Sequence, residues 1–66
     1  MKRLTQLRLE RGWSKSELAR RAGLNQTTVS AIENGRLVPY EVQLAKLSAA
    51  LDVVPESLCE EVTTHG

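Results

Sequence analysis

The sequence has very few of the residues that build catalytic or metal centres. Its 66 residues include one cysteine, Cys59, one histidine, His65, and two aromatic residues, Trp13 and Tyr40. A single cysteine excludes an internal disulfide, so the fold has to rest on hydrophobic packing, as in proteins of the reducing cytoplasm. His65 is penultimate in a polar segment, 62–66, which we expect to be a frayed tail rather than a source of ligands. We therefore predict neither a metal site nor a cofactor.

Long apolar runs are also missing. No stretch reaches the ~18 residues of a membrane span, and none resembles the apolar core of a signal peptide. We therefore expect a cytoplasmic protein that does not bind membranes. A chain of 66 residues forms one small domain, whose core only just offsets the entropy of ordering the chain. We place this domain at residues 1–61.

Charge is distributed unevenly, although the net charge is only +1. Residues 1–40 contain eight Lys and Arg against three Glu, a net charge of +5. Residues 41–66 contain one Lys against five Asp and Glu, a net charge of −4. A basic half suits a surface that faces phosphates, while the acidic half must face elsewhere. The distribution is thus consistent with nucleic-acid binding, which the total charge alone would argue against.

Apolar residues recur with the 3.6-residue period of helices, and β-branched residues never alternate with polar ones over the length of a strand. We therefore predict an all-α fold. Helices are expected at about 2–11, 15–22, 26–34, 39–51 (with Pro39 in the first turn) and in a short segment opened by Pro55. The residues predicted to face inward are Leu4, Leu7, Leu18, Ala19, Ala22, Val29, Ile32, Tyr40, Leu44, Leu47 and Leu51.

The second and third helices have clear start and stop signals. Ser14 is the expected N-cap of the second helix, and Glu17 lies three residues later, where it can close a capping box. Gly23 can end this helix in the conformation that needs no Cβ, and Asn25 can cap the third helix. A turn of only about three residues therefore joins the two helices.

The outward face of the third helix is suited to hydrogen bonding with DNA bases. Gln26 is the strongest candidate, because an amide can bond an adenine edge twice, a contact worth roughly 1 to 3 kcal/mol of discrimination. Thr27 and Ser30 can add less specific bonds. Ala31 either offers its methyl group to thymine or is an ordinary surface alanine. The side chains expected to contact phosphates instead are Lys15, Asn34 and Arg36.

Six parts of the chain carry a combined signal: LRLERGWS at 7–14, SELARRAGL at 16–24, QTTVSAIENG at 26–35, Pro39, LAKLSAAL at 44–51 and the closing PESL. Taken together, these segments resemble the Cro/repressor-type (lambda repressor-like, XRE) helix-turn-helix family, whose members are five-helix domains that bind operator DNA. The resemblance extends over nearly the whole chain. Any single segment would occur in many unrelated helical proteins, but jointly they are a specific signal.

The resemblance implies an ion pair between Arg8 and Glu33, which ties the first helix to the recognition helix. Both residues lie on otherwise apolar faces, and the alternative of two separately solvated charges is disfavoured by the cost of unpaired burial. Lys15 departs from the family, in which glutamine at this position bonds both a phosphate and the first residue of the recognition helix. Lysine is expected to keep only the phosphate contact, which would leave Gln26 less rigidly held.

A second copy of the chain is also expected. A lone domain with few base contacts discriminates too little for a genomic operator, and helix-turn-helix proteins commonly dimerise across half-sites about 34 Å apart. We therefore predict a homodimer with its interface in the acidic half. Leu58 has two alternatives, because it either belongs to this interface or simply closes the core. The predicted interface residues are Val54, Pro55, Leu58 and Cys59, with further contributions from Leu37 and Val38.

Two classes of function fit these observations. The leading hypothesis is a sequence-specific transcriptional regulator, a repressor, which inserts the helix from Gln26 to Asn34 into the major groove of double-stranded DNA as a homodimer. The alternative is an antitoxin-like interaction module whose C-terminal half docks a partner protein. We do not expect an enzyme, because no nucleophile, base and orienting group can be assembled from these residues.

Overall fold

A computed structural model describes residues 1–59, and these residues form five helices with no strand among them. The predicted all-α, five-helix fold is therefore confirmed. No helix in this part of the chain combines the length and the hydrophobicity needed to cross a membrane. The predicted domain end at residue 61 and the predicted tail at 62–66 lie outside the described residues. The helices are α1 (Lys2–Glu10), α2 (Lys15–Ala22), α3 (Gln26–Glu33), α4 (Glu41–Leu51) and α5 (Pro55–Cys59).

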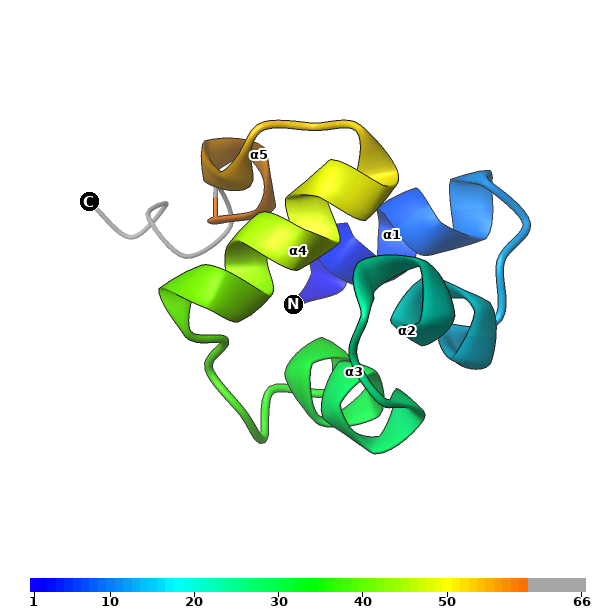
Figure 1. The fold of residues 1–66 in the computed structure, drawn as a ribbon, viewed down its shortest axis with the longest axis horizontal. Coiled ribbons are helices and arrows are strands. Elements are labelled where there is room, and N and C mark those ends of the chain that lie inside the picture. The colour runs from blue at the N-terminus through cyan, green and yellow to red at the C-terminus, as the bar shows by residue number, and fades with distance from the viewer. Residues whose placement is uncertain (60–66) are drawn as a thin grey trace.

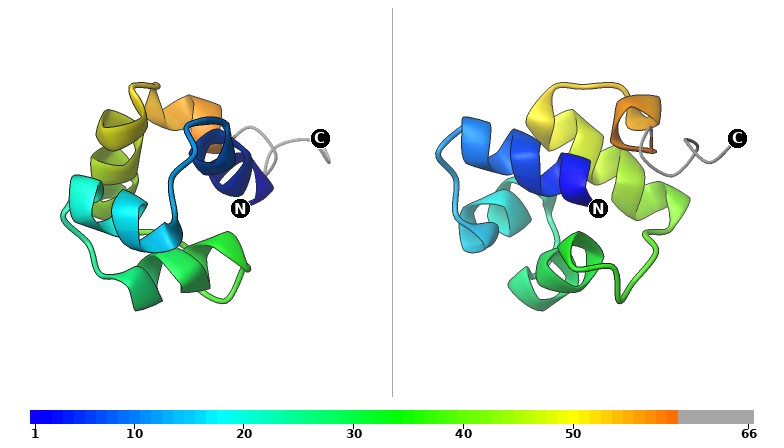
Figure 2. Two further views of the ribbon diagram at one scale, coloured as in Figure 1. Left: turned by 90° about the vertical axis from the view of Figure 1, so that its right-hand side faces the viewer. Right: turned by 180° about the vertical axis from the view of Figure 1, so that it is seen from behind.

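The helices pack so that α3 and α5 lie at opposite ends of the molecule (Figure 1). α2 packs against α3 and α4, whereas α1 packs against α3 and α5. The views from the side and from behind show the same arrangement, with α3 at the end away from α5 (Figure 2). One whole side of α3 therefore remains uncovered by the other helices.

Aliphatic side chains from all five helices build the core. Leu4 and Leu7 of α1 are buried while Leu9 of the same helix is exposed, as the helical period predicts. The inward faces predicted for α2 and α3 are also confirmed. The buried hydrophobic residues are Leu4, Leu7, Leu18, Ala19, Ala22, Val29, Ile32, Leu47, Leu51 and Leu58.

The start of α4 differs from the prediction. Pro39 does not lie in the first turn, because the helix begins at Glu41 and Tyr40 is its N-cap. The backbone N–H of Tyr40 donates to Oε1 of Gln43 at 2.9 Å, which satisfies a donor that has no partner within the helix. Tyr40 is extended, with ψ of 162°, and 72% of its surface is exposed. The prediction that Tyr40 faces inward was therefore wrong, and the inward face of this helix begins at Leu44, which packs against the core.

Of the two hydrogen bonds of the capping box predicted for α2, one is present. Oγ of Ser14 accepts the backbone N–H of Glu17 at 3.0 Å. The Glu17 carboxylate turns instead to Arg20 and Arg21, each at 2.5 Å, because two guanidinium groups on the next turn attract it more strongly than one backbone N–H. The hydrogen bond from Arg21 is the main reason that the pKa of Glu17 lies below its ordinary value of 4.5; Arg20 also lowers it, and desolvation opposes both. The Arg21 guanidinium also lies 4.4 Å from the centre of the Trp13 ring.

Candidate nucleic-acid interface

A tight turn sets the angle between α2 and α3. Gly23 has φ of 73°, a left-handed conformation that strains any residue with a Cβ. The N–H of Leu24 donates back to the Ala19 carbonyl at 2.9 Å, which closes the end of α2. Asn25 then occupies the N-cap of α3. The predicted turn of three residues is thus present, and Ala19 is buried as predicted.

The cap of α3 differs in its chemistry from the prediction. Asn25 holds the N-cap position with extended backbone, but its side chain does not accept a helix N–H. Oδ1 of Asn25 accepts the hydroxyl of Thr28 at 2.7 Å instead. A hydroxyl in the first turn can replace the backbone donor as the partner of the cap. The hydrogen bond between Asn25 and Thr28 still connects the N-cap to the first turn of α3.

Six side chains gather around a shallow concavity of about 290 Å³ on the uncovered side of α3. We call this concavity the recognition surface. It contains every residue that the sequence indicated for base contacts and two of the three indicated for phosphates. Its residues are Gln26, Thr27, Ser30, Ala31, Asn34 and Arg36.

The loop after α3 folds back to hold Arg36 beside the helix. Oδ1 of Asn34 accepts the N–H of Arg36 at 3.1 Å, and the same N–H lies 2.9 Å from the Ala31 carbonyl. Gly35 has φ of 85°, which allows this reversal. Oδ1 of Asn34 can only accept, so its amide NH₂ group is the part suited to donate to a phosphate oxygen. Arg36 is exposed beside it.

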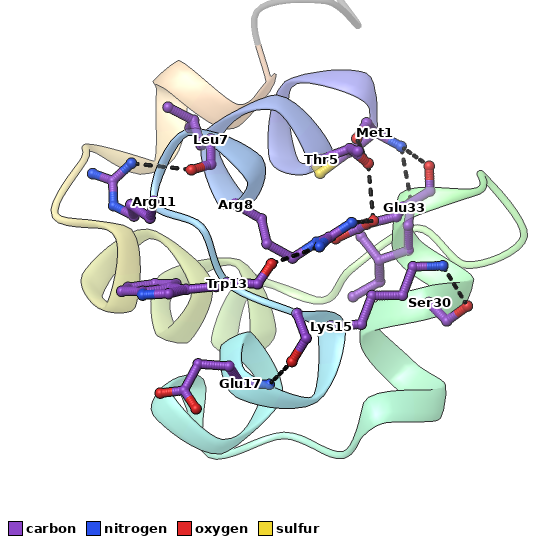
Figure 3. A network of polar contacts seen from close by, with 12 residues as sticks. Met1, Thr5, Leu7, Arg8, Arg11, Trp13, Lys15, Glu17, Ser30 and Glu33 are labelled. Atoms are coloured by element: carbon purple, nitrogen blue, oxygen red, sulfur yellow. Dashed lines mark hydrogen bonds and ion pairs between the residues drawn. The ribbon is translucent and has the colours of Figure 1, made fainter.

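The ion pair between Arg8 and Glu33 is present and well aligned (Figure 3). Nε of Arg8 lies 2.7 Å from Oε2 of Glu33, and Nη2 lies 3.2 Å from Oε1. The side chains are only 10% and 4% exposed. The remaining polar groups are satisfied as well, because Nη1 of Arg8 donates to the Trp13 carbonyl at 2.7 Å and Thr5 donates to Oε1 of Glu33 at 3.0 Å. This network ties the last turn of α3 to α1.

A backbone contact adds to this connection. The Met1 nitrogen donates to the carbonyls of Ile32 and Glu33 at 2.9 Å each. Carbonyls in the last turn of a helix have no partner within the helix, so an outside donor stabilises that end. The sequence carries no signal for this contact, because no local pattern relates residues so far apart along the chain.

Lys15 makes a contact within the protein that the sequence did not predict. Its side chain runs from the start of α2 towards α3, where Nζ lies 3.4 Å from Oγ of Ser30 (Figure 3). Lys15 therefore contacts α3, although not at Gln26, and the predicted phosphate contact of Lys15 stays a prediction. Its partner is Ser30 rather than Gln26, because the long side chain reaches one turn further along α3.

The predicted interface residues separate into different environments. Leu58 is completely buried in the core, which decides between its two alternatives and removes it from the predicted interface. Val54 is 62% exposed and Pro55 beside it is exposed. Val38 is exposed, whereas Leu37 packs against the core. The side chain of Cys59 lies outside what the structure describes.

The short turn between α2 and α3, the open polar face of α3 and its attachment to α1 are the features of a helix-turn-helix domain. The sequence matches the family model for the helix-turn-helix domain over residues 2–62. The chain therefore belongs to the helix-turn-helix proteins, in their Cro/repressor-type branch.

Individual relatives agree with this assignment. A Neisseria hypothetical transcription factor from Neisseria meningitidis is 43% identical over 51 residues, which are 77% of this chain and 48% of that protein. The HTH-type transcriptional regulator SinR from Bacillus subtilis is 42% identical over 60 residues, 89% of this chain and 54% of SinR. The restriction-modification controller protein C.AhdI from Aeromonas hydrophila has a similar structure, with a TM-score of 0.83, 37% identity and 86% of each chain covered. The chain spans about half the length of the curated relatives it matches.

Proposed function

We propose that this chain is the DNA-binding domain of a sequence-specific transcriptional regulator, a repressor, with α3 as its recognition helix. The observation that carries the proposal is the recognition surface, where hydrogen-bonding side chains gather on a side of α3 that no other helix covers. An α-helix fits the major groove of B-form DNA, in which each base pair presents a distinct pattern of donors and acceptors. Two of the relatives are named as a transcription factor and a transcriptional regulator, which favours this hypothesis over the protein-docking alternative.

The residues of the recognition surface have different roles in this proposal. Gln26, Thr27 and Ser30 face the bases from the first two turns of α3, with the Ala31 methyl group available to thymine. Asn34 and Arg36 flank the helix and donate to phosphates, contacts that fix the register without carrying sequence information. The Arg8–Glu33 ion pair holds the helix in position and does not touch the DNA.

Alanine at Gln26 and alanine at Arg36 should affect DNA binding in different ways. Gln26→Ala removes a bidentate base contact, so one position of the preferred site should become degenerate and the preferred base there should lose about 5- to 100-fold in relative affinity. Arg36→Ala should weaken all duplexes alike and lower the slope of log Kd against log salt concentration by about one. Selection from a random duplex pool, followed by titrations at several salt concentrations, measures both effects.

Two exposed residues outside the recognition surface serve as matched controls. Gln6 lies on α1 and Lys46 on α4, so alanine at either position should leave the preferred site unchanged. Identical profiles for Gln26→Ala and Arg36→Ala would contradict the assigned roles. If the unmodified protein retains no duplex from the pool, the proposal as a whole is wrong.

We also propose that the regulator acts as a homodimer that uses the exposed surface at Val54 and Pro55. This surface is apolar, belongs to the acidic half and adjoins α5, at the end away from α3, so that pairing would leave both recognition surfaces free. Val54→Asp would place an unpaired charge in a dehydrated interface. We expect this variant to sediment as a monomer at micromolar concentrations at which the unmodified protein is a dimer. The control is Leu9→Asp, which changes an exposed leucine of α1 and should remain dimeric. If the unmodified protein sediments as a monomer, the proposal of a homodimer is wrong.

A further inference from the structure

Lys15 contributes a cationic donor at the edge of the recognition surface. It is the first residue of α2, and its side chain is half-buried rather than extended into solvent. Nζ lies 3.4 Å from Oγ of Ser30, and Ser30 lines the recognition surface (Figure 3). A lysine ammonium carries three donors, so one long hydrogen bond to Ser30 leaves two donors for another partner.

The same contact restricts what the Ser30 hydroxyl can recognise. A serine hydroxyl ordinarily donates or accepts, whichever its partner requires. An ammonium group can only donate, so Oγ of Ser30 accepts from Lys15, and its own proton is left to donate. The hydroxyl of Ser48 is used differently from that of Ser30, because it donates its proton to the Ala45 carbonyl within α4, at 3.0 Å. Lys15 and Ser30 together therefore present mainly donors, namely two from the ammonium and one from the hydroxyl, against a single remaining lone pair on Oγ.

We propose that Lys15 and Ser30 together recognise a guanine, which makes Lys15 a specificity-determining residue rather than only a phosphate contact. Guanine is the base whose major-groove edge presents two neighbouring acceptors, N7 and O6. Adenine presents one acceptor and one donor there, so a unit that offers mainly donors suits adenine less well than guanine. Gln26 offers both a donor and an acceptor, so Gln26 and the Lys15–Ser30 unit select different bases. This inference rests on the proposed function.

Lys15→Met tests the inference, because it keeps the length of the apolar side chain and removes the ammonium. The preferred duplex is first selected from a random pool with the unmodified protein, and each guanine is then replaced in turn by adenine or by 7-deazaguanine, which lacks N7. At one guanine, both replacements should cost the unmodified protein about tenfold in affinity. Lys15→Met should bind the original and the replaced duplexes with nearly equal affinity at that position and keep its preferences elsewhere. Lys15→Arg, which retains donors, should keep most of the guanine preference.

Other results overturn the inference. If Lys15→Met weakens binding to all duplexes alike and lowers the salt slope by about one, Lys15 is a phosphate contact. The inference is also contradicted if the selected site contains no guanine on the recognised strands. It is contradicted as well if Lys15→Met still discriminates between guanine and its replacements as the unmodified protein does. Both results leave the proposed function intact. If the unmodified protein binds no duplex, the proposed function itself fails and this inference with it. Circular dichroism of each variant verifies that the helices are intact.

Discussion

Glu33→Ala should lower the free energy of unfolding by about 3 to 5 kcal/mol, the cost of leaving one member of a buried ion pair without its partner. The Arg8 side chain is only 10% exposed, so bulk water solvates it poorly once the carboxylate is lost. The hydroxyl of Thr5 loses its shorter hydrogen bond at the same time and keeps only the longer one, 3.4 Å to the Met1 carbonyl. A core of this size rarely supplies more than about 3 to 5 kcal/mol, so the variant should be largely unfolded at 25 °C. Urea titration, with circular dichroism and the fluorescence of the single tryptophan, Trp13, measures the change.

Two further variants separate the effect of burial from the effect of charge. The double variant Arg8→Met with Glu33→Leu replaces the pair by apolar side chains and should regain most of the lost stability, because no buried charge is left unpaired. Glu17→Ala removes a carboxylate from an exposed ion pair on α2 and should change stability far less than Glu33→Ala. If Glu33→Ala is as stable as the unmodified protein, the ion pair does not hold α3. If the double variant is stable but binds DNA weakly, the pair positions α3 in addition to stabilising it.

Leu4→Ala should have an effect of similar size for a different reason. Leu4 is completely buried in the core, and its truncation removes apolar contacts and leaves a cavity, which costs about 2 to 5 kcal/mol. α1 packs against both α3 and α5, so the lost contacts affect the whole fold rather than one helix. The midpoint of thermal unfolding followed by circular dichroism should fall steeply.

The same helix supplies the matched control for this experiment. Leu9 is 61% exposed, so Leu9→Ala should change the free energy of unfolding by no more than about 0.5 kcal/mol. The chemical change is identical in the two variants, and only the burial differs. Equal losses in Leu4→Ala and Leu9→Ala would contradict the assignment of the core.

Local sequence alone determined the helices and most of their faces. The spacing of Leu4 and Leu7 separated them from Leu9, and Ser14 marked the start of α2. Gly23 marked its end. Such signals act within one or two turns of helix, so they can be recognised without knowledge of the fold. The candidate base-contacting side chains followed from the same period, because residues that cannot face the core have to face outward.

Only the tertiary structure decided how these helices meet. Tyr40 fits the apolar spacing of α4, but it precedes the first turn of the helix and is exposed to solvent. Leu58 fits both an interface and a core, and only the packing of α5 against α1 and α4 decides for the core. The ion pair of Arg8 and Glu33 was expected from the family resemblance rather than from any local pattern. The contact between Lys15 and Ser30 spans 15 residues and crosses from one helix to another. Helical periodicity specifies which side of a helix is apolar, whereas partners between helices depend on packing angles and side-chain reach, which only the assembled core fixes.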